Sequence, residues 1–255
     1  MRPDGRAADE VRPITIETGF IRYPEGSVLY RAGDTVVLCN VSVLDRTAPF
    51  LRGTGEGWIT AEYAMLPRAT EDRSDREVTR GRPSGRSQEI QRLIGRALRV
   101  AVDRSLLGER TLQADCDVLQ ADGSTRTAAI SGSWVALVLA LGRMWEQGIL
   151  PRWPLLHQVA GVSVGLLGGE PIVDLDYTED YDCDVDLNLV FTAGGELVEI
   201  QGTAEGRPFP RSDLDAMVAA GWSGARRIMA RQAEAVAPLL EDLGLPPLSP
   251  PGGSS

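Results

Sequence analysis

Near the middle of the chain lies a segment that is expected to fold as a helix without a polar side. It begins at Ser124 or Thr125, either of which is a suitable N-cap, and runs to about residue 147. A helix that is apolar nearly all round belongs in the interior of a protein. Its apolar centre, residues 128–142, is interrupted by serines and is too short to cross a bilayer. We therefore expect a buried core helix and no membrane contact.

Patterns typical of strands and of two amphipathic helices fill most of the remaining chain. The first third predicts antiparallel strands, and a single α+β domain of mixed sheets packed with helices is expected over residues 1–242, because neither a repeat nor a linker interrupts it. The tail, residues 243–255, is rich in proline, glycine and serine, which predicts disorder. The expected strands are residues 14–17, 27–30, 35–38, 58–66, 111–120, 159–166, 171–175 and 196–201, and the expected helices are residues 88–107 and 212–235.

Cysteine and charge content limit the class of protein. Three cysteines without a CxxC pair, and no apolar signal segment at the N-terminus, favour a cytoplasmic protein with reduced thiols. The formal net charge of -10 argues against a generic nucleic-acid coat, so any RNA contact must come from a local patch. The single histidine, His157, lies in an apolar run without GxSxG nearby, which argues against a zinc site and a Ser-His-Asp triad. A dinucleotide fold is also disfavoured, because the glycine-rich residues 53–57 precede a strand instead of following one.

Residues 174–186 (DLDYTEDYDCDVD) carry seven carboxylates and no basic residue. From Asp182 onward acidic and apolar residues alternate, which predicts a strand with one buried face. Two interpretations stay open from these residues alone. The acids could line a solvated strand face, or they could hold magnesium, which prefers oxygen ligands.

A second charged segment has the opposite sign. Residues 68–104 contain ten arginines and six acids, so this segment carries a net charge of +4. All 26 basic residues of the chain are arginine, so a salt-bridged surface is one interpretation and a phosphate-tracking patch is the other. No aromatic residue lies between Pro67 and Ile90, so contact with the RNA backbone is expected from the loop, and base stacking is not.

Two expected helix starts combine an arginine with free backbone amides. Arg86 follows Ser84-Gly85, and Arg126 follows the sequence Asp-Gly-Ser-Thr at residues 122–125. The positive end of a helix dipole disfavours a cation. An arginine in the first turn therefore indicates a bound anion between the guanidinium and the helix N-terminus. The pattern is not a P-loop, because GxxxxGK[ST] is absent.

Six blocks together resemble the ribonuclease PH family of phosphate-dependent 3′ exoribonucleases. In chain order they are MRPDGR, GWITAEYAMLPRAT, SGRSQEIQRLIGRALR, CDVLQADGSTRTAAISG, DLDYTEDYDCDVD and VEIQGTAEG, spread over nearly the whole chain. The resemblance implies an α+β fold of the ribonuclease PH type, related to a domain of a small-subunit ribosomal protein. It also implies an enzyme that releases 3′-terminal nucleotides of RNA as nucleoside diphosphates, reversibly.

The resemblance assigns roles to residues of this chain. It implies a phosphate site at Arg86, Ser124, Thr125 and Arg126, RNA-guiding side chains at Arg68, Arg73 and Arg76, and catalytic, magnesium-binding carboxylates at Asp180 and Asp186. The family usually has glycine where Ser124 stands, so this serine either adds a hydroxyl ligand or crowds the backbone. One aspartate, if protonated, could act as a general acid. Because a fully extended strand would place the two aspartates about 20 Å apart, the chain has to turn between Thr178 and Asp182.

The resemblance also implies partners. These are tRNA precursors, inorganic phosphate as co-substrate, and further copies of the chain in a hexameric ring. The sequence disfavours two other functions. A non-catalytic RNA-binding ring subunit of the same fold is disfavoured because the arginines and aspartates are retained together, and a small-molecule phosphotransferase because no glycine-rich ATP loop is present.

Overall fold

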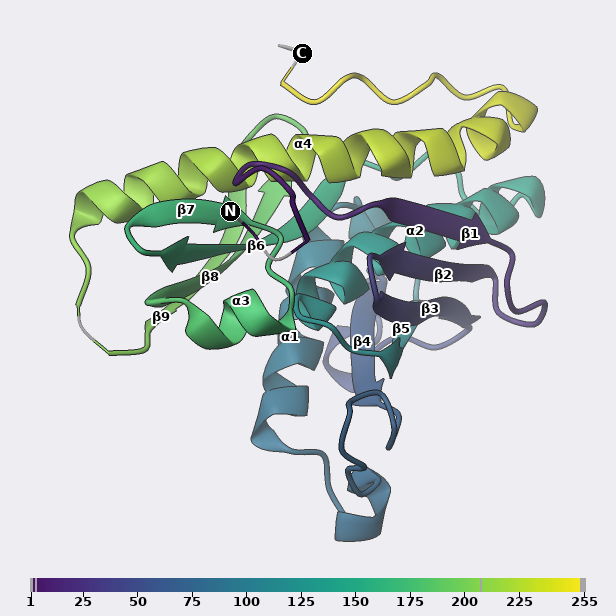
Figure 1. Cartoon of the computed structure of the whole chain (residues 1–255). Helices are drawn as coiled ribbons and strands as arrows, with labels where there is room; N and C mark the ends of the chain where they lie inside the picture. Colours follow the sequence, from purple (N-terminus) through teal and green to yellow (C-terminus); the bar gives the residue numbers. More distant parts are fainter. Residues whose placement is uncertain (1, 3, 207, 253–255) are drawn as a thin grey trace.

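A computed structural model describes residues 2, 4–206 and 208–252, apart from the side chains of Val78 and Arg80. Two β-sheets enclose one long helix, and a second long helix, α4, crosses the same side of the molecule as both termini (Figure 1). The fold is α+β, as the sequence predicts, with one mixed and one antiparallel sheet.

The first sheet has five strands in the order β1-β2-β3-β5-β4. All its neighbours pair antiparallel except β4, which pairs in parallel with β5 and so departs from the antiparallel pattern expected for the first third. The physical reason is helix α1 (Gly85–Val100), which crosses over between these two strands as parallel pairing requires. The strands are β1 (Ile14–Thr18), β2 (Gly26–Ala32), β3 (Thr35–Leu44), β4 (Trp58–Met65) and β5 (Thr111–Gln120).

The second sheet has four antiparallel strands in the order β7-β6-β8-β9. Its strands are β6 (Val159–Leu167), β7 (Glu170–Val173), β8 (Val185–Thr192) and β9 (Leu197–Ala204). The short helix α3 (Tyr177–Asp182) connects β7 to β8, so the strand expected from Asp182 begins only at Val185. The cause is a capping box, in which Asp176 and Glu179 satisfy each other's backbone amides and start a helix in the acidic run.

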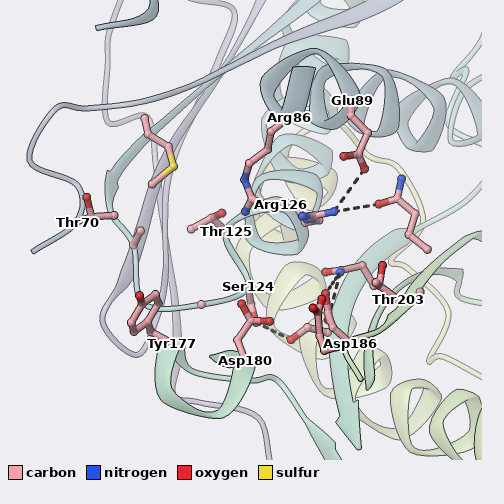
Figure 2. Close-up of a pocket in the computed structure, with 18 residues that line it drawn as sticks. Thr70, Arg86, Glu89, Ser124, Thr125, Arg126, Tyr177, Asp180, Asp186 and Thr203 are labelled. Carbon is pink, nitrogen blue, oxygen red and sulfur yellow. Dashed lines mark hydrogen bonds and ion pairs between the residues drawn. The ribbon is translucent and has the colours of Figure 1, made fainter. Parts of the chain in front are cut away.

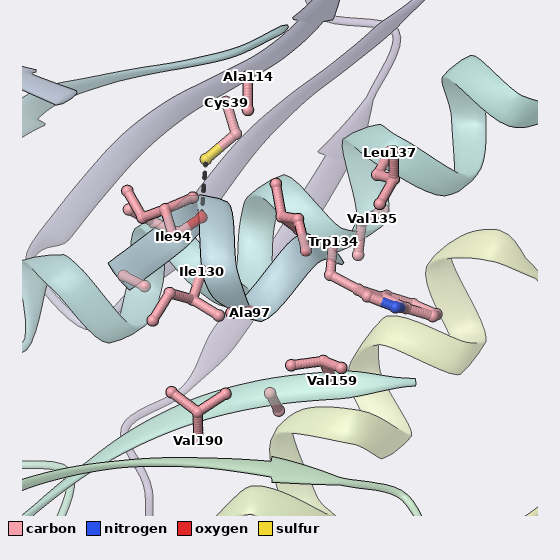
Figure 3. Packing of buried hydrophobic residues seen from close by; sticks show 14 of the residues in the cluster. Cys39, Ile94, Ala97, Ala114, Ile130, Trp134, Val135, Leu137, Val159 and Val190 are labelled. Carbon is pink, nitrogen blue, oxygen red and sulfur yellow. Dashed lines mark hydrogen bonds between the residues drawn. The ribbon is translucent and has the colours of Figure 1, made fainter. Parts of the chain in front are cut away.

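Helix α2 (Thr125–Glu146) is the buried helix expected from the sequence. It packs against β2 and β3 of one sheet and β6 of the other, and Figure 3 shows Ile130 and Trp134 between Cys39 and Val159. Trp134 is fully buried, which stabilises the fold by about 2–3 kcal/mol. Among the described residues α2 alone has the length and hydropathy of a membrane span, and 89% of its apolar window is buried inside the protein.

The remaining bounds differ modestly from expectation. Helix α1 ends at Val100, before residue 107, and the one-turn helices η1 (Pro49–Leu51), η2 (Glu77–Arg80) and η3 (Arg104–Leu106) lie in loops. Helix α4 (Arg211–Asp242) continues past residue 235 and contains Pro238. The expected tail has no helix or strand over residues 243–252, where Leu245 and Leu248 pack against the core; residues 253–255 lie outside the described part of the chain.

Candidate active site

A cavity of about 680 Å³ opens where the N-terminal ends of α1 and α2 face α3, β8 and β9. Six of the predicted site residues line it (Figure 2). The arginines lie on one side of the cavity and the aspartates on the other. Those six residues are Arg86, Ser124, Thr125, Arg126, Asp180 and Asp186.

The arginine side is built from two helix starts. Helix α1 begins after Ser84, whose hydroxyl accepts the backbone N–H of Ser87, and Arg86 follows in the first turn. The guanidinium of Arg126, in the first turn of α2, donates to Gln201 on β9 at 3.2 Å and lies 3.4 Å from a carboxylate oxygen of Glu89 on α1. Three elements therefore hold Arg126 in place, and both guanidinium groups face the same cavity as the free amides of the helix ends.

Thr125 contacts a buried phenol. The hydroxyl oxygens of Thr125 and Tyr63 are 2.8 Å apart, and burial raises the pKa of Tyr63. A phenol that keeps its proton can donate to the threonine oxygen, which leaves the threonine's own proton for a ligand in the cavity. Tyr63 is thus a positioning residue that its place in an apolar strand pattern did not reveal.

Ser124 is the N-cap residue of α2, but its side chain does not cap the helix. Its backbone is left-handed, with φ at 55°, a conformation that favours glycine. The hydroxyl turns away from the helix end and contacts the carbonyl oxygen of Leu175 at 2.8 Å and the hydroxyl of Ser163 at 2.5 Å. Ser163 in turn accepts the backbone N–H of Leu175. The hydroxyl therefore ties α2 to the segment before α3, and the part of Ser124 that can face an anion is its backbone.

Replacing Ser124 by glycine is expected to leave the half-saturating phosphate concentration unchanged within about twofold, because the lost hydroxyl does not point at the anion. Glycine also relieves about 1 kcal/mol of left-handed strain, which offsets the lost hydrogen bonds. Alanine keeps the strain and loses the bonds, so Ser124→Ala should unfold at lower urea concentration than Ser124→Gly. A large rise in half-saturating phosphate for the glycine variant would instead make the hydroxyl a ligand.

The aspartate side depends on the turn that α3 makes. Asp180 lies on α3 and Asp186 is the second residue of β8, and Figure 2 shows both side chains at the same side of the cavity. The amide of Asn188 donates to the carboxylate of Asp186 at 3.1 Å. Burial, with the nearby charge of Asp180, raises the pKa of Asp186 to about 6, and burial raises the pKa of Asp180 as well. The turn expected between Thr178 and Asp182 is present as this helix.

The N-terminal segment holds α3 in position. The guanidinium of Arg2 donates to both carboxylate oxygens of Glu179 at 2.6 Å, and it also donates to the carbonyl oxygens of Val173 and Asp174. Both side chains of the pair are buried. Removing one partner of such a pair typically costs about 3–5 kcal/mol, so Arg2 fixes the helix that carries Asp180.

The two aspartates fit a divalent cation. Magnesium usually takes one or two carboxylates from a protein and completes its shell with water and substrate phosphates. Burial raises the pKa of both carboxyls, and the charge of Asp180 raises that of Asp186 further, so a cation between the two would relieve an unfavourable concentration of negative charge. Within residues 2, 4–206 and 208–252, no group of three or more His, Cys, Asp or Glu side chains could hold a metal by itself.

The predicted RNA-guiding arginines lie outside this cavity. They belong to residues 66–84, a segment that projects from the body below α1 and β4 (Figure 1). Arg68 is exposed, Arg73 pairs with Asp75 at 3.1 Å, and Arg76 lines a separate cavity beside Asp117. The structure thus separates them from the phosphate and carboxylate groups.

Several cavity residues went unassigned in the sequence. Gln201 and Thr203 alternate along β9 and face the cavity, and their period-two spacing within the VEIQGTAEG block was the available signal. Glu89 and Ser163 gave no such signal, because their partners are distant in the sequence. The other newly placed residues are Met65, Thr70, Ala121, Gly123, Tyr177, Asn188, Gly202 and Glu205.

Comparison with known proteins identifies the family of the chain. Residues 10–141 match domain 1 of the 3′ exoribonuclease family of ribonuclease PH, and residues 157–224 match domain 2. The chain belongs to this family. The family's two domains correspond to the two sheets, which share helix α2 and one continuous hydrophobic core.

Solved structures with the same fold include exosome proteins. Rice (Oryza sativa) Rrp46 aligns with a TM-score of 0.74 at 22% identity, covering 91% of this chain and 97% of that one. A chain of the Archaeoglobus fulgidus exosome with RNA bound to the active site aligns with a TM-score of 0.74 at 23% identity, covering 90% and 92%. A chain of an archaeal exosome core aligns with a TM-score of 0.71 at 23% identity, covering 91% of this chain and 90% of that one.

Proposed function

We propose that this protein is a phosphorolytic 3′-to-5′ exoribonuclease, in which inorganic phosphate removes 3′-terminal nucleotides of RNA as nucleoside diphosphates. One observation carries the proposal: Arg86 and Arg126 face Asp180 and Asp186 across a single cavity. A hydrolase needs water as the nucleophile and has no use for a second anion site. Phosphorolysis has to bring two anions together, which requires cationic groups on one side.

The cavity can carry out the reaction as an in-line displacement. The guanidinium groups and helix amides hold inorganic phosphate, one of whose oxygens attacks the phosphorus of the last phosphodiester. The bond from that phosphorus to the 3′ oxygen of the preceding nucleotide breaks, and this oxygen takes up the proton that the attacking hydrogen phosphate gives up. The products are a nucleoside diphosphate and an RNA shortened by one nucleotide. Because the diphosphate retains a phosphoanhydride bond, the reaction should reverse when nucleoside diphosphates are abundant.

Asp180 and Asp186 would hold the magnesium ion. When bound, this ion would neutralise charge on the phosphodiester and on the departing oxygen. The protein's own contribution is to orient the carboxylates: the amide of Asn188 donates to Asp186, and the pair of Arg2 with Glu179 fixes the helix that carries Asp180.

The deciding experiment uses an RNA labelled at its 3′-terminal nucleotide, incubated with and without inorganic phosphate and magnesium. Labelled nucleoside diphosphate that forms only with phosphate supports the proposal. Labelled monophosphate that forms without phosphate contradicts it. The reverse reaction, addition of a nucleotide from a nucleoside diphosphate, provides an independent check.

A second function is a non-catalytic RNA-binding ring subunit. It is favoured by the structural similarity to exosome proteins, although at 22–23% identity that similarity extends only to the fold. The same labelling experiment separates the two functions, because a binding subunit would retain the RNA and release no nucleotide. We place the catalytic function first because the arginines and aspartates are all present in one cavity.

Ring assembly and tRNA precursors as substrates extend the proposal. A ring would present the projecting segment, residues 66–84, several times around one RNA, which raises the local concentration of phosphate contacts. Size-exclusion chromatography with light scattering would measure the number of subunits. Precursor tRNA with extra 3′ nucleotides should then be shortened faster by the assembled form than by diluted protein.

The magnesium requirement should depend on pH. The pKa of Asp186, raised to about 6, means that a proton competes with the cation below this pH. The half-saturating magnesium concentration is therefore expected to be flat above about pH 7 and to rise about tenfold for each unit below pH 6. Binding of Mn²⁺, followed by electron paramagnetic resonance, checks this without turnover. A flat profile down to about pH 5 would remove Asp186 from the cation site.

A further inference from the structure

We propose that Tyr177, extended by Tyr181, is a base-stacking platform for the 3′-terminal nucleotides of a single-stranded RNA. This inference rests on the proposed function, since it names the surface that holds the RNA end during phosphorolysis. The loop arginines have no aromatic neighbours in the sequence, so an RNA base needs a stacking partner from another element.

Both tyrosine rings on α3 are exposed. The exposed fraction is 64% for Tyr177 and 81% for Tyr181, whereas Tyr30 and Tyr63 are buried; Tyr23, between β1 and β2, is also exposed but does not line the cavity. Residues four apart in a helix lie on the same side, so the two rings follow one another along α3. Asp180 lies three residues after Tyr177 and shares that side of the helix. The platform is therefore built on the same turn as a catalytic carboxylate.

Tyr177 is continuous with the active site. It lines the same cavity as Arg86 and Asp180, and Figure 2 shows its ring on the side of the cavity where Thr70 lies. Thr70 belongs to the projecting segment that carries Arg68 and the other loop arginines. An RNA strand that leaves the cavity between Tyr177 and Thr70 would therefore reach the loop arginines next.

The charge around the tyrosines selects which part of the RNA can lie there. Asp176 and Asp182 flank the pair on α3, and an acidic surface repels the phosphate backbone. The face of a base is uncharged and stacks on an aromatic ring, so α3 suits bases while the loop arginines suit phosphates. Such stacking tolerates any sequence, because every base offers a π face.

The platform is held in place before RNA arrives. The backbone N–H of Tyr177 donates to the carboxylate of Asp122 at 3.2 Å, which ties it to the loop that leads into α2. The capping box and the buried Arg2–Glu179 pair fix the rest of α3. A ring on a rigid helix loses little conformational freedom when a base stacks on it.

The test compares Tyr177→Ala and Tyr177→Phe with the wild-type protein, with Thr178→Ala as the matched control on the exposed surface of α3. Binding is measured by fluorescence anisotropy of a 5′-labelled single-stranded RNA, without phosphate or magnesium. Phosphorolysis is measured with the same RNA, and the concentrations of RNA and of inorganic phosphate are each varied from below to above saturation. Circular dichroism confirms that each variant is folded.

We expect Tyr177→Ala to weaken RNA binding and raise the KM for RNA by about tenfold or more, with the half-saturating phosphate concentration unchanged. Phenylalanine keeps the ring and should retain wild-type affinity, as should Thr178→Ala. The double variant Tyr177→Ala, Tyr181→Ala should lose more than the single one. An RNA that lacks the base which stacks on Tyr177 should bind the wild type more weakly by the same factor. Removing that base should not weaken binding to Tyr177→Ala any further.

Two results would overturn the inference while leaving the proposed function intact. One is that each missing base weakens RNA binding to the wild type and to Tyr177→Ala by the same factor. The other is a loss in Tyr177→Phe as large as in Tyr177→Ala, which would assign the effect to the hydroxyl. If the wild type binds RNA with tyrosine-dependent affinity but releases no nucleoside diphosphate, the proposed function fails and the platform stands.

Discussion

Replacing Asp186 by asparagine is expected to reduce phosphorolysis by about 10³-fold and, at the same time, to stabilise the metal-free protein. The loss of activity is expected because the amide cannot supply the negative charge that the proposed cation site needs opposite Arg86 and Arg126. Losses of this size are typical when a single charge-stabilising group is removed from an active site. RNA binding should remain, because the substitution leaves the exposed surface of α3 and the loop arginines untouched.

The gain in stability follows from the raised pKa. Burial and the charge of Asp180 shift the pKa of Asp186 from 3.8 to about 6, so the ionised group destabilises the folded state. The destabilisation is fully present above pH 6, declines as the pH falls toward the unfolded value, and vanishes below about pH 3.8. Asparagine should therefore raise the free energy of unfolding at pH 7 by about 1–3 kcal/mol, and by nothing near pH 3.

Urea unfolding at both pH values, without divalent cations, measures this gain. Asp182→Asn is the matched control, since Asp182 is an exposed acid at the end of α3, and it should change neither stability nor turnover appreciably. Magnesium should raise the melting temperature of the wild type and leave that of Asp186→Asn unchanged. An Asp186→Asn variant that retains turnover would refute the role of this carboxylate.

Replacing Arg86 by alanine is expected to raise the half-saturating phosphate concentration by about 100-fold or more, while RNA affinity changes by less than about threefold. Arg86 is exposed in the first turn of α1, faces the cavity, and is separated from the projecting segment that we assign to the RNA backbone. Charge-assisted hydrogen bonds to an anion are each worth about 1.5–3 kcal/mol, and a bidentate guanidinium makes two.

Initial rates over a range of phosphate concentrations, with RNA saturating, measure the first quantity, and anisotropy without phosphate measures the second. Arg92→Ala is the control, because Arg92 is an exposed arginine of the same helix that does not line this cavity. It should leave the phosphate requirement unchanged. Equal losses of phosphate and RNA affinity in Arg86→Ala would place the anion site elsewhere.

Local sequence patterns located most of the fold. Strand β5 coincides with its predicted bounds, and the burial of α2 follows from a surface that is apolar nearly all round. These predictions succeed because helix and strand periodicities depend on near neighbours. The parallel pairing of β4 with β5 was not predicted, because it depends on where α1 crosses the sheet.

The acidic stretch shows the same limit within one segment. Alternation predicted a strand from Asp182. Instead, the hydrogen bonds between Asp176 and Glu179 start a helix that ends at Asp182, and the strand begins at Val185. Helix α3 then brings Asp180 to the same side of the cavity as Asp186. The capping-box residues Asp176 and Glu179 could be read from the sequence. Whether they form a helix or the alternating pattern forms a strand depends on Arg2, which binds Glu179 although it lies 177 residues away in the sequence.

By itself the sequence determined the fold class and the buried helix, since these follow from residue type and short-range spacing. The two arginines were marked by their place at helix starts, and the two aspartates were singled out by the resemblance to the ribonuclease PH family. Tertiary structure alone decided which of them meet. It joined α1, α2, α3 and β8 around one cavity, turned the Ser124 hydroxyl away from it, and set the loop arginines apart. The physical reason is that desolvation, charge pairing and hydrogen-bond competition act between groups that are close in space, and chain spacing does not specify that closeness.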